Sequence, residues 1–83
     1  MKNIIFIQHA LERLEERGIS TKMVEEVIRD PDDADYGDKG RKIAQKLIDE
    51  KLLRVIYDEE EYRIVVISAY ATSKVEKYLR WKR

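Results

Sequence analysis

The stretch IVVISAY, at residues 64–70, decides the fold class of this chain. Its first four side chains, Ile64 to Ile67, are all β-branched, and this favours an extended strand over a helix. An apolar run without polar alternation is typical of a central strand that is covered on both faces. We therefore predict a strand over residues 62–70 in the middle of a sheet.

Two segments before this strand alternate with a period of two. Residues 43–48 and residues 52–57 both show the alternation that is typical of strands. The turn at residues 49–51 joins them as a hairpin, and the acidic run at residues 58–61 joins the second strand to the third. The pattern predicts a three- to four-stranded antiparallel sheet.

Helical periodicity replaces this alternation near the start of the chain. Three apolar side chains within residues 8–17 fall on one helix face, namely Ala10, Leu11 and Leu14. Gly18 then ends this helix. Ser20 or Thr21 caps a second helix, which Pro31 terminates.

The remaining segments complete an α+β domain. Residues 32–40 are acidic and contain two glycines, so we expect a loop there. Thr72 or Ser73 is predicted to cap a C-terminal helix. Its inward-facing side chains are Val75, Tyr78 and Leu79, and Trp81 follows in a basic tail. A chain of 83 residues has room for a single domain, over residues 1–83.

Composition excludes several classes of site. The chain has no cysteine, which excludes disulfides, thiolate zinc sites and cysteine nucleophiles. No apolar run approaches the roughly 20 residues of a membrane span, and the N-terminus lacks the features of a signal peptide. We expect a soluble cytoplasmic protein without a membrane partner. Charged residues make up 41 %, and amides are few, as is typical of thermophilic proteins.

The charges are unevenly distributed although the formal net charge is zero. Residues 41–57 carry five Lys and Arg against two acids, and residues 62–83 carry six against one. Acidic residues concentrate in the predicted loops. This distribution predicts a basic face suited to nucleic acid. The alternative is the charge-rich surface of a thermophilic protein.

A line of titratable and cationic side chains follows the first predicted helix. His9, Arg13 and Arg17 recur every four residues, beside the apolar face. An imidazole moves protons near neutral pH, and a guanidinium binds phosphate and stabilises charge on a pentacoordinate phosphorus. The line therefore predicts phosphodiester chemistry. The alternative is local ion pairing with Glu12 and Glu16 on an exposed helix.

Two cations interrupt the apolar pattern of the predicted hairpin. Lys46 and Arg54 lie in the middle of their strands, and with Arg41 and Lys42 they predict a ladder of cations on one sheet face. Such a ladder is unfavourable unless a polyanion covers it. The alternative is a solvated face on which Lys46 pairs with Glu50 or a similar acid.

The end of the third predicted strand suggests a further ligand site. Tyr70 is placed to stack on a base. Thr72 precedes a predicted helix N-terminus, whose free N–H groups suit a phosphate. The alternative is a core tyrosine followed by an ordinary N-cap. The acids between residues 32 and 38 lack the terminal glutamate of an EF-hand, and no cofactor motif is present, so we predict neither metal nor cofactor.

Several of these residues resemble a known family. The element HAxxRxxxRGI at residues 9–19 resembles the opening of a small bacterial and archaeal domain of unknown function. The strand segments LRVIY at residues 53–57 and IVVISAYAT at residues 64–72 resemble both that family and the BrnT toxins. BrnT belongs to the RelE/ParE-like toxin group. The similarity spans about residues 8–79.

The resemblance implies a RelE-like fold, with N-terminal helices packed on a twisted antiparallel sheet. It also implies a metal-independent endoribonuclease toxin with a cognate antitoxin. By position, His9 and Arg13 would be active-site residues on the first helix. The cations for the phosphate and the transition state would be Arg41, Lys46 and Arg54. BrnT-like sequences end the third strand with Ala-Arg, whereas this chain has Ala69-Tyr70, so that the terminal cation is missing or replaced.

Two hypotheses follow. In the first, the chain is a toxin that cleaves RNA through attack of the 2′-hydroxyl on its own phosphate. Its catalytic group is His9, Arg13, Lys46 and Arg54. Its RNA-binding group is Arg17, Arg41, Tyr70, Thr72 and Lys74. In the second hypothesis, the chain is a non-catalytic module that binds RNA or protein; both hypotheses leave a homo-oligomer open.

Overall fold

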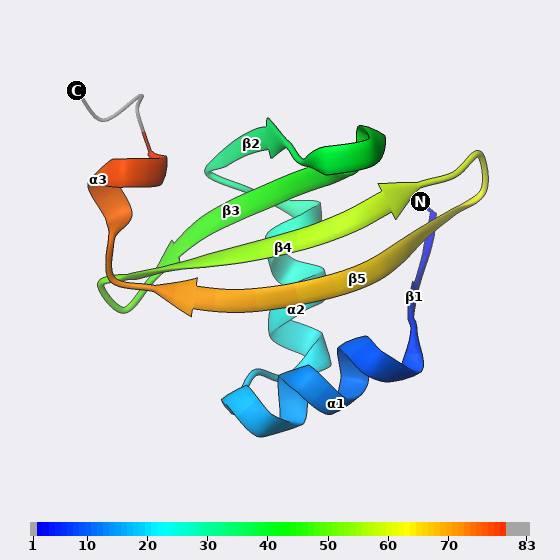
Figure 1. The fold of residues 1–83 in the computed structure, drawn as a ribbon, viewed down its shortest axis with the longest axis horizontal. Coiled ribbons are helices and arrows are strands. Elements are labelled where there is room, and N and C mark those ends of the chain that lie inside the picture. The colour runs from blue at the N-terminus through cyan, green and yellow to red at the C-terminus, as the bar shows by residue number, and fades with distance from the viewer. Residues whose placement is uncertain (1, 80–83) are drawn as a thin grey trace.

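The structure is a computed structural model, and it describes residues 2–79. Five strands and three α-helices form this part of the chain (Figure 1). In chain order the elements are β1 (Asn3–Phe6), α1 (Gln8–Arg17), α2 (Thr21–Arg29), β2 (Asp33–Tyr36), the 3₁₀ turn η1 (Asp38–Gly40), β3 (Lys42–Ile48), β4 (Lys51–Glu59), β5 (Arg63–Thr72) and α3 (Val75–Tyr78).

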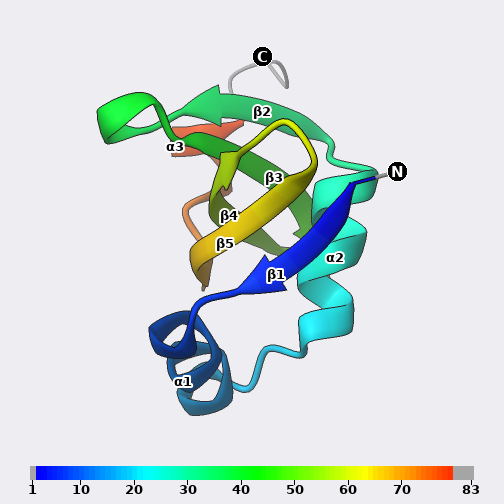
Figure 2. The same cartoon turned by 90° about the vertical axis from the view of Figure 1, so that its right-hand side faces the viewer.

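The strands form one mixed sheet in the order β1-β5-β4-β3-β2. β1 runs parallel to β5, and the other neighbours are antiparallel. The α+β class is confirmed, and the stretch at residues 64–70 lies in β5, between β1 and β4. Figure 2 shows α2 and α3 on opposite sides of the sheet. None of the helices in the described range has the length and apolar character needed to cross a bilayer.

The prediction of three to four antiparallel strands was wrong at both edges of the sheet. β1 was not recognised, because four residues are too short to show a period and their parallel pairing with β5 is a contact distant in the sequence. β2 lies within residues 32–40, where a loop was expected. Aspartate has a low strand propensity, and the strand exists here because it pairs with β3.

The hydrophobic core fills the side of the sheet that faces α2. Its buried members are Ala10, Leu14, Val24, Val27, Ala44, Leu53, Val55, Val66 and Ala69. Side chains alternate between the two faces of a strand. The neighbours of these core residues in β3, β4 and β5 therefore point to the other side, where α3 lies. We call this side the α3 face.

A β-bulge decides which side chains of β5 reach the α3 face. Ile67 is the extra residue, because its neighbours Val66 and Ser68 pair with consecutive residues of β4. One extra residue shifts the alternation by one position. Tyr70 consequently lies opposite Arg54 on the α3 face. Without the bulge, Tyr70 would point toward the core.

The end of α1 and both ends of α2 have the predicted causes. Gly18 follows α1 with a φ of 68°, a left-handed conformation that glycine adopts without steric cost. Ser20 is the N-cap of α2, and its hydroxyl accepts the Met23 N–H at 3.0 Å. The helix ends at Arg29, two residues before Pro31.

The C-terminal helix is shorter than predicted. α3 is a single turn, and its N-cap is Lys74 rather than Thr72 or Ser73. The Thr72 hydroxyl instead accepts the Lys74 N–H at 3.1 Å, which forms a local turn. Leu79 directly follows α3 and is fully buried, so it anchors this end of the chain. Trp81 lies outside the described residues.

Candidate functional site

The α3 face carries a buried guanidinium. Arg54, in β4, is only 8 % exposed, and its Nε–H donates to the Gln45 side-chain oxygen at 2.7 Å. Its Nη1 donates to the Tyr70 hydroxyl. The Tyr78 ring of α3 covers the guanidinium at 3.8 Å from the ring centroid. We call these four residues the arginine–tyrosine cluster.

Among residues 2–79, no carboxylate oxygen lies within 4.0 Å of Arg54, so no acid in this range neutralises its charge. Burial of an unpaired charge costs several kcal/mol unless hydrogen bonds and ring contacts compensate. Here an amide, a hydroxyl and an aromatic face supply that compensation, the ring alone contributing up to about 2 kcal/mol. The cluster therefore holds an uncancelled positive charge near the surface.

The cluster also alters one of its own phenols. Hydrogen bonding with the Tyr70 hydroxyl lowers the pKa of Tyr78, and the positive charges of Lys77 and Arg54 lower this pKa further. Desolvation acts in the opposite direction. Hydrogen-bond donors and cations stabilise the oxygen anion, so the pKa of Tyr78 lies below that of an ordinary tyrosine.

The predicted line on the first helix is present on α1, and we call it the α1 row. Nε of Arg13 donates to Nε2 of His9 at 3.3 Å, and Nη1 of Arg13 also contacts a carboxylate oxygen of Glu16 at 3.1 Å. The local ion pair of the alternative interpretation is therefore real for Arg13. His9 is exposed, and in this arrangement its Nε2 acts as the acceptor.

Arg17 brings the α1 row to the edge of β5. Its Nη1 donates to the backbone oxygen of Ala69 at 2.7 Å. The next residue, Tyr70, is the hydroxyl partner of Arg54. β5 therefore lies between Arg17 and the arginine–tyrosine cluster at this position. The structure brings the end of the row, but not His9, next to the cluster.

The predicted cation ladder does not form. Lys46 pairs with Leu53, a core residue, so Lys46 lies on the face opposite to Arg54. Its Nζ donates to the backbone oxygen of Asp30 at 2.9 Å and lies 3.4 Å from the Asp30 carboxylate, at the end of α2. The alternative of pairing with an acid is confirmed for Lys46, although the acid is Asp30 rather than Glu50.

Two further cations of the predicted ladder are also paired with acids. Nε of Arg41 lies 3.7 Å from Asp58, and Nζ of Lys42 lies 2.6 Å from Glu59. The Lys42 contact also raises the lysine pKa, chiefly through its hydrogen bond to Glu59. Neither cation contacts the arginine–tyrosine cluster.

The expected phosphate site after the third strand is also not formed. A single-turn helix offers no extended set of free N–H groups, and the Thr72 hydroxyl is used in the turn to Lys74. Tyr70 is half-buried, with its hydroxyl bound to Arg54. It therefore positions the guanidinium and does not present an open ring for stacking.

Acid pairing divides the cations of residues 2–79 into two groups. Those with a carboxylate within 4.0 Å are Lys2, Arg13, Arg29, Arg41, Lys42, Lys46 and Arg63. Those without one, in the same part of the chain, are Arg17, Lys22, Lys39, Lys51, Arg54, Lys74 and Lys77.

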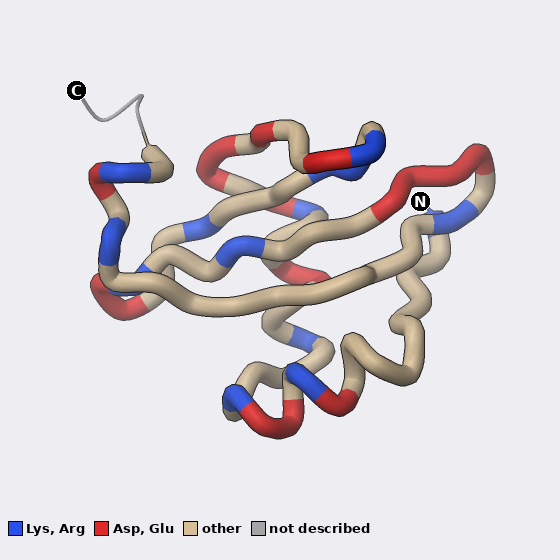
Figure 3. The backbone as a smooth tube through the Cα atoms, in the orientation of Figure 1, with Lys and Arg blue, Asp and Glu red and all other residues tan. Residues whose placement is uncertain are grey.

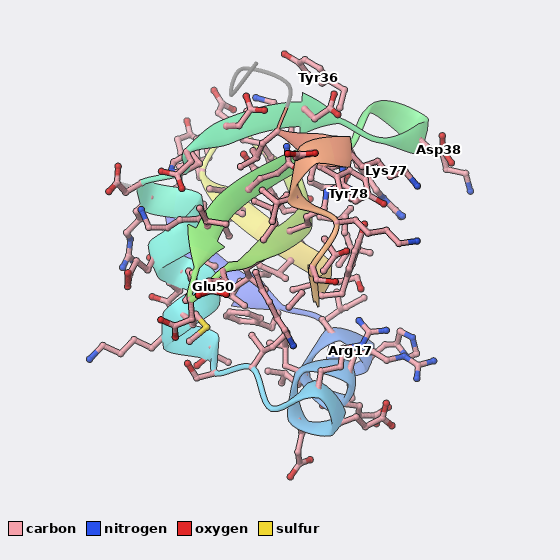
Figure 4. The ribbon with its side chains drawn as sticks, turned by 90° about the vertical axis from the view of Figure 1, so that its left-hand side faces the viewer. Arg17, Tyr36, Asp38, Glu50, Lys77 and Tyr78 are labelled. Carbon is pink, nitrogen blue, oxygen red and sulfur yellow. The ribbon has the colours of Figure 1, made fainter. Side chains whose placement is uncertain are left out.

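Most of the cations without an acid lie toward one end of the sheet. The β3–β4 turn, the end of β5, α3 and the end of α1 meet there (Figures 1 and 3). We call it the basic end and define it by Arg17, Lys51, Arg54, Lys74 and Lys77. Figure 4 views the molecule from this end, with Arg17, Lys77 and Tyr78 labelled. Asp49, Glu50 and Glu76 belong to the same end, so the positive charge is local.

Two members of the site were not predicted as site residues. Gln45 was read as an ordinary strand position, and Tyr78 as an inward-facing helix residue. A fully buried glutamine in a strand is a recognisable signal only when its register is known, and here it pairs with Arg54. No group of three metal-ligating side chains occurs among the described residues.

Comparison with known proteins identifies the family. Residues 6–71 match the model of the family described as Domain of unknown function (DUF4258), so the chain belongs to that family. The matched range contains the α1 row, Arg54 and Tyr70, and it ends before α3. No match was found among curated proteins or among solved structures.

Proposed function

We propose that this protein is the RNA-cleaving toxin of a toxin–antitoxin pair, with a RelE/BrnT-like fold, and that it acts in the cytoplasm. The HAxxRxxxRGI element and the two strand segments support this proposal by resemblance. The geometry supports it through an arrangement of cations suited to a sugar-phosphate chain. The partners are RNA and a cognate antitoxin protein.

One observation carries the proposal. The cations of the basic end have no acid partner among the described residues, whereas the cations elsewhere in that range are mostly paired. Unpaired cations that lie close together repel one another, so their clustering has an electrostatic cost that a polyanion removes. RNA has the matching charge.

The reaction needs no external nucleophile. The 2′-oxygen of RNA attacks the adjacent phosphorus, the bond from phosphorus to the 5′-oxygen breaks, and a 2′,3′-cyclic phosphate and a 5′-hydroxyl result. His9 accepts the proton of the 2′-hydroxyl, a role worth about 10²–10⁴-fold in rate. Water protonates the leaving oxygen. Arg13, which contacts His9, stabilises the charge that develops on the phosphorane, whereas Arg54 contributes its positive charge from beyond β5 without touching the phosphate.

Fewer residues take part in RNA binding and cleavage in this proposal than the sequence predicts. Arg17 and Lys74 hold the phosphate backbone, and Tyr70 positions Arg54 through its hydroxyl. Lys46 and Arg41 have structural ion pairs and take no part in the reaction. Thr72 shapes the turn into α3.

A second candidate function is a non-catalytic RNA- or protein-binding module. The observation in its favour is the burial of Arg54 beneath Tyr78, which keeps the guanidinium from direct contact with a phosphate unless the ring moves. The absence of an arginine at Tyr70 points the same way. This candidate retains binding and loses cleavage.

Incubation of the purified, antitoxin-free protein with single-stranded and structured RNA in EDTA tests the proposal. We expect cleavage that yields 2′,3′-cyclic phosphate ends, and at least a hundred-fold loss of rate in His9→Ala. Arg29→Ala, which removes an exposed, acid-paired cation on α2, is the matched control and retains the rate. No cleavage by the wild type, or equal cleavage by His9→Ala, overturns the enzymatic claim.

A binding measurement separates the two candidates. RNA affinity that falls steeply with rising salt, without cleavage, supports the RNA-binding module. Absence of salt-dependent RNA binding and of cleavage indicates a protein-binding module.

A further inference from the structure

A cavity of about 360 Å³ opens at the C-terminal end of α1. It lies between the α1–α2 turn, which contributes Gly18 and Ile19, and the hairpin that joins β3 to β4. A second hollow of about 250 Å³ shares the lining residues Met23 and Ile48 with it, so the two hollows are adjacent at the start of α2. The cavity lies on the core side of the sheet, away from the arginine–tyrosine cluster, since Leu53 lines it.

The lining of the cavity combines an apolar floor with a charged rim. Ile19, Leu53 and Ala71 supply aliphatic surface, and Leu53 is almost fully buried. Arg17 and Lys51 bring cations to the rim, and neither has a carboxylate within 4.0 Å in the described part of the chain. A ligand that fits this lining has a flat or compact apolar part directly attached to an anion.

Asp49 adds a third feature to the same rim. It lies in the turn between β3 and β4, where it lines the cavity beside Lys51. A carboxylate there accepts hydrogen bonds and repels other anions. It therefore favours a ligand whose apolar part carries an N–H donor at its edge, such as the exocyclic amino group of cytosine or adenine.

The position of the cavity connects it to the α1 row. His9, Arg13 and Arg17 advance along α1 by about 6 Å at each step, and Arg17 is both the last member of the row and a lining residue of the cavity. Nη1 of Arg17 donates to the Ala69 carbonyl, while the remaining N–H donors of the guanidinium have no hydrogen-bond partner among residues 2–79. A strand that follows the row with its phosphates reaches the mouth of the cavity.

We propose that this cavity is a nucleobase subsite, which takes one splayed base of a single-stranded RNA while Arg17 and Lys51 bind its phosphate. The inference rests on the proposed function and extends it to substrate selection. Asp49 gives preference to bases that carry an amino group, and uridine is disfavoured. Recognition of unstacked bases in pockets is the usual way in which proteins read single-stranded RNA.

Nucleotide titrations of the isotope-labelled protein, followed by NMR, test this assignment. The probes are the 3′-monophosphates of cytidine, adenosine, guanosine and uridine. We expect cytidine 3′-monophosphate to shift the amide signals of Gly18, Ile19 and Ala71, with uridine 3′-monophosphate binding several-fold more weakly. Asp49→Asn should reduce this preference while the hairpin stays intact, because asparagine tolerates the positive φ of this position.

A matched pair of variants isolates the cavity. Ala71→Met fills it from an exposed strand position and should weaken nucleotide binding at least ten-fold. Ala34→Met makes the same change at an exposed position of β2, outside the cavity, and should bind as the wild type does. Equal binding by Ala71→Met and the wild type overturns the proposal, as does the absence of amide shifts with all four nucleotides.

Three further outcomes separate this proposal from others. Shifts at the same amides with the peptide acetyl-Asp-Leu-Glu-amide, but with no nucleotide, overturn it in favour of a protein partner. His9-dependent RNA cleavage that persists without nucleotide binding in the cavity removes the subsite and leaves the proposed function intact. Nucleotide binding there without RNA cleavage supports the subsite and removes the proposed enzymatic function.

Discussion

The guanidinium of Arg54 is enclosed between the Tyr70 hydroxyl, which accepts its Nη1–H, and the Tyr78 ring, which lies 3.8 Å from it, measured to the ring centroid. The first contact comes from the neighbouring strand and the second from the helix that follows this strand. α3 is only one turn long, so its position depends on contacts of this kind rather than on helix stability. The cluster therefore joins α3 to the sheet.

Substitution of Tyr78 should loosen α3. Tyr78→Ala removes the ring from Arg54, and we expect a loss of about 1–2 kcal/mol in the free energy of unfolding, measured by urea denaturation. Tyr78→Phe keeps the ring and should cost less than half of that amount. Equal losses in the two variants would show that the hydroxyl, rather than the ring, holds the arginine.

Gln45 should be more important for stability than its surroundings suggest. Gln45→Leu leaves the Nε–H of the buried Arg54 without its acceptor, and an unsatisfied charged donor costs about 1–3 kcal/mol. Arg54→Met in the same chain removes the orphaned donor. We therefore expect the double variant to be more stable than the sum of the two single losses predicts, as measured in a double-mutant cycle with urea. Additive losses would mean that the two side chains do not interact.

This cluster shows where prediction from the sequence was successful and where it stopped. Local signals placed α1, α2 and the three long strands, because periodicity, a glycine and an N-cap serine act within a few residues. Arg54 was correctly singled out as a cation in an apolar strand. Its environment depends on register, which local signals do not determine.

Two structural details, each one residue in size, explain the errors. The β3–β4 turn has two residues, Asp49 and Glu50, rather than three, and this register places Lys46 opposite Leu53 on the core side. The bulge at Ile67 then reverses the facing of Tyr70. Neither detail has a glycine or proline to mark it. β1 was missed because the strand it pairs with, β5, is distant in the sequence. β2 was missed because it lacks the residues that are usual in strands.

One substitution in the β3–β4 turn should raise the stability of the protein. Asp49 and Glu50 have φ values of 50° and 68°, and the left-handed conformation costs an ordinary residue about 1–2 kcal/mol. Glu50→Gly should therefore raise the stability by about 1 kcal/mol after the entropy cost of glycine, which corresponds to about 4–8 °C in Tm for a domain of this size. Calorimetry measures the shift. Glu50→Ala removes the carboxylate but keeps the Cβ, so a similar gain in that control would assign the effect to charge.

Low pH should destabilise the end of the sheet at which β4 is joined to β5. Glu59 accepts a hydrogen bond from Lys42 at 2.6 Å and another from Lys2 at 2.9 Å, and these contacts lower the Glu59 pKa. A carboxyl whose folded pKa lies below its unfolded pKa stabilises the protein above the unfolded value, near pH 4.5, and this stabilisation is lost as the pH falls through the folded pKa.

The matching experiment compares Tm between pH 6 and pH 2 for the wild type and for Glu59→Gln. We expect the wild type to lose more stability below about pH 4.5 than the variant, because the variant has no carboxylate to protonate. The difference should shrink in high salt, since the three side chains are partly exposed. Parallel Tm profiles at low salt would show that the pair of lysines does not stabilise the fold.

Lys46 and Lys74 should separate structural cations from RNA-binding cations. Lys46 donates to the last turn of α2 through the Asp30 carbonyl, so Lys46→Met should cost about 1 kcal/mol in stability and leave RNA affinity unchanged. Lys74 belongs to the basic end and has no carboxylate within 4.0 Å among residues 2–79. Lys74→Gln should therefore keep the stability and lower the slope of log affinity against log salt by about 0.7 for single-stranded RNA. Urea denaturation and RNA titrations at several salt concentrations measure the two effects, and a change of slope in Lys46→Met instead would place Lys46 among the cations that bind RNA.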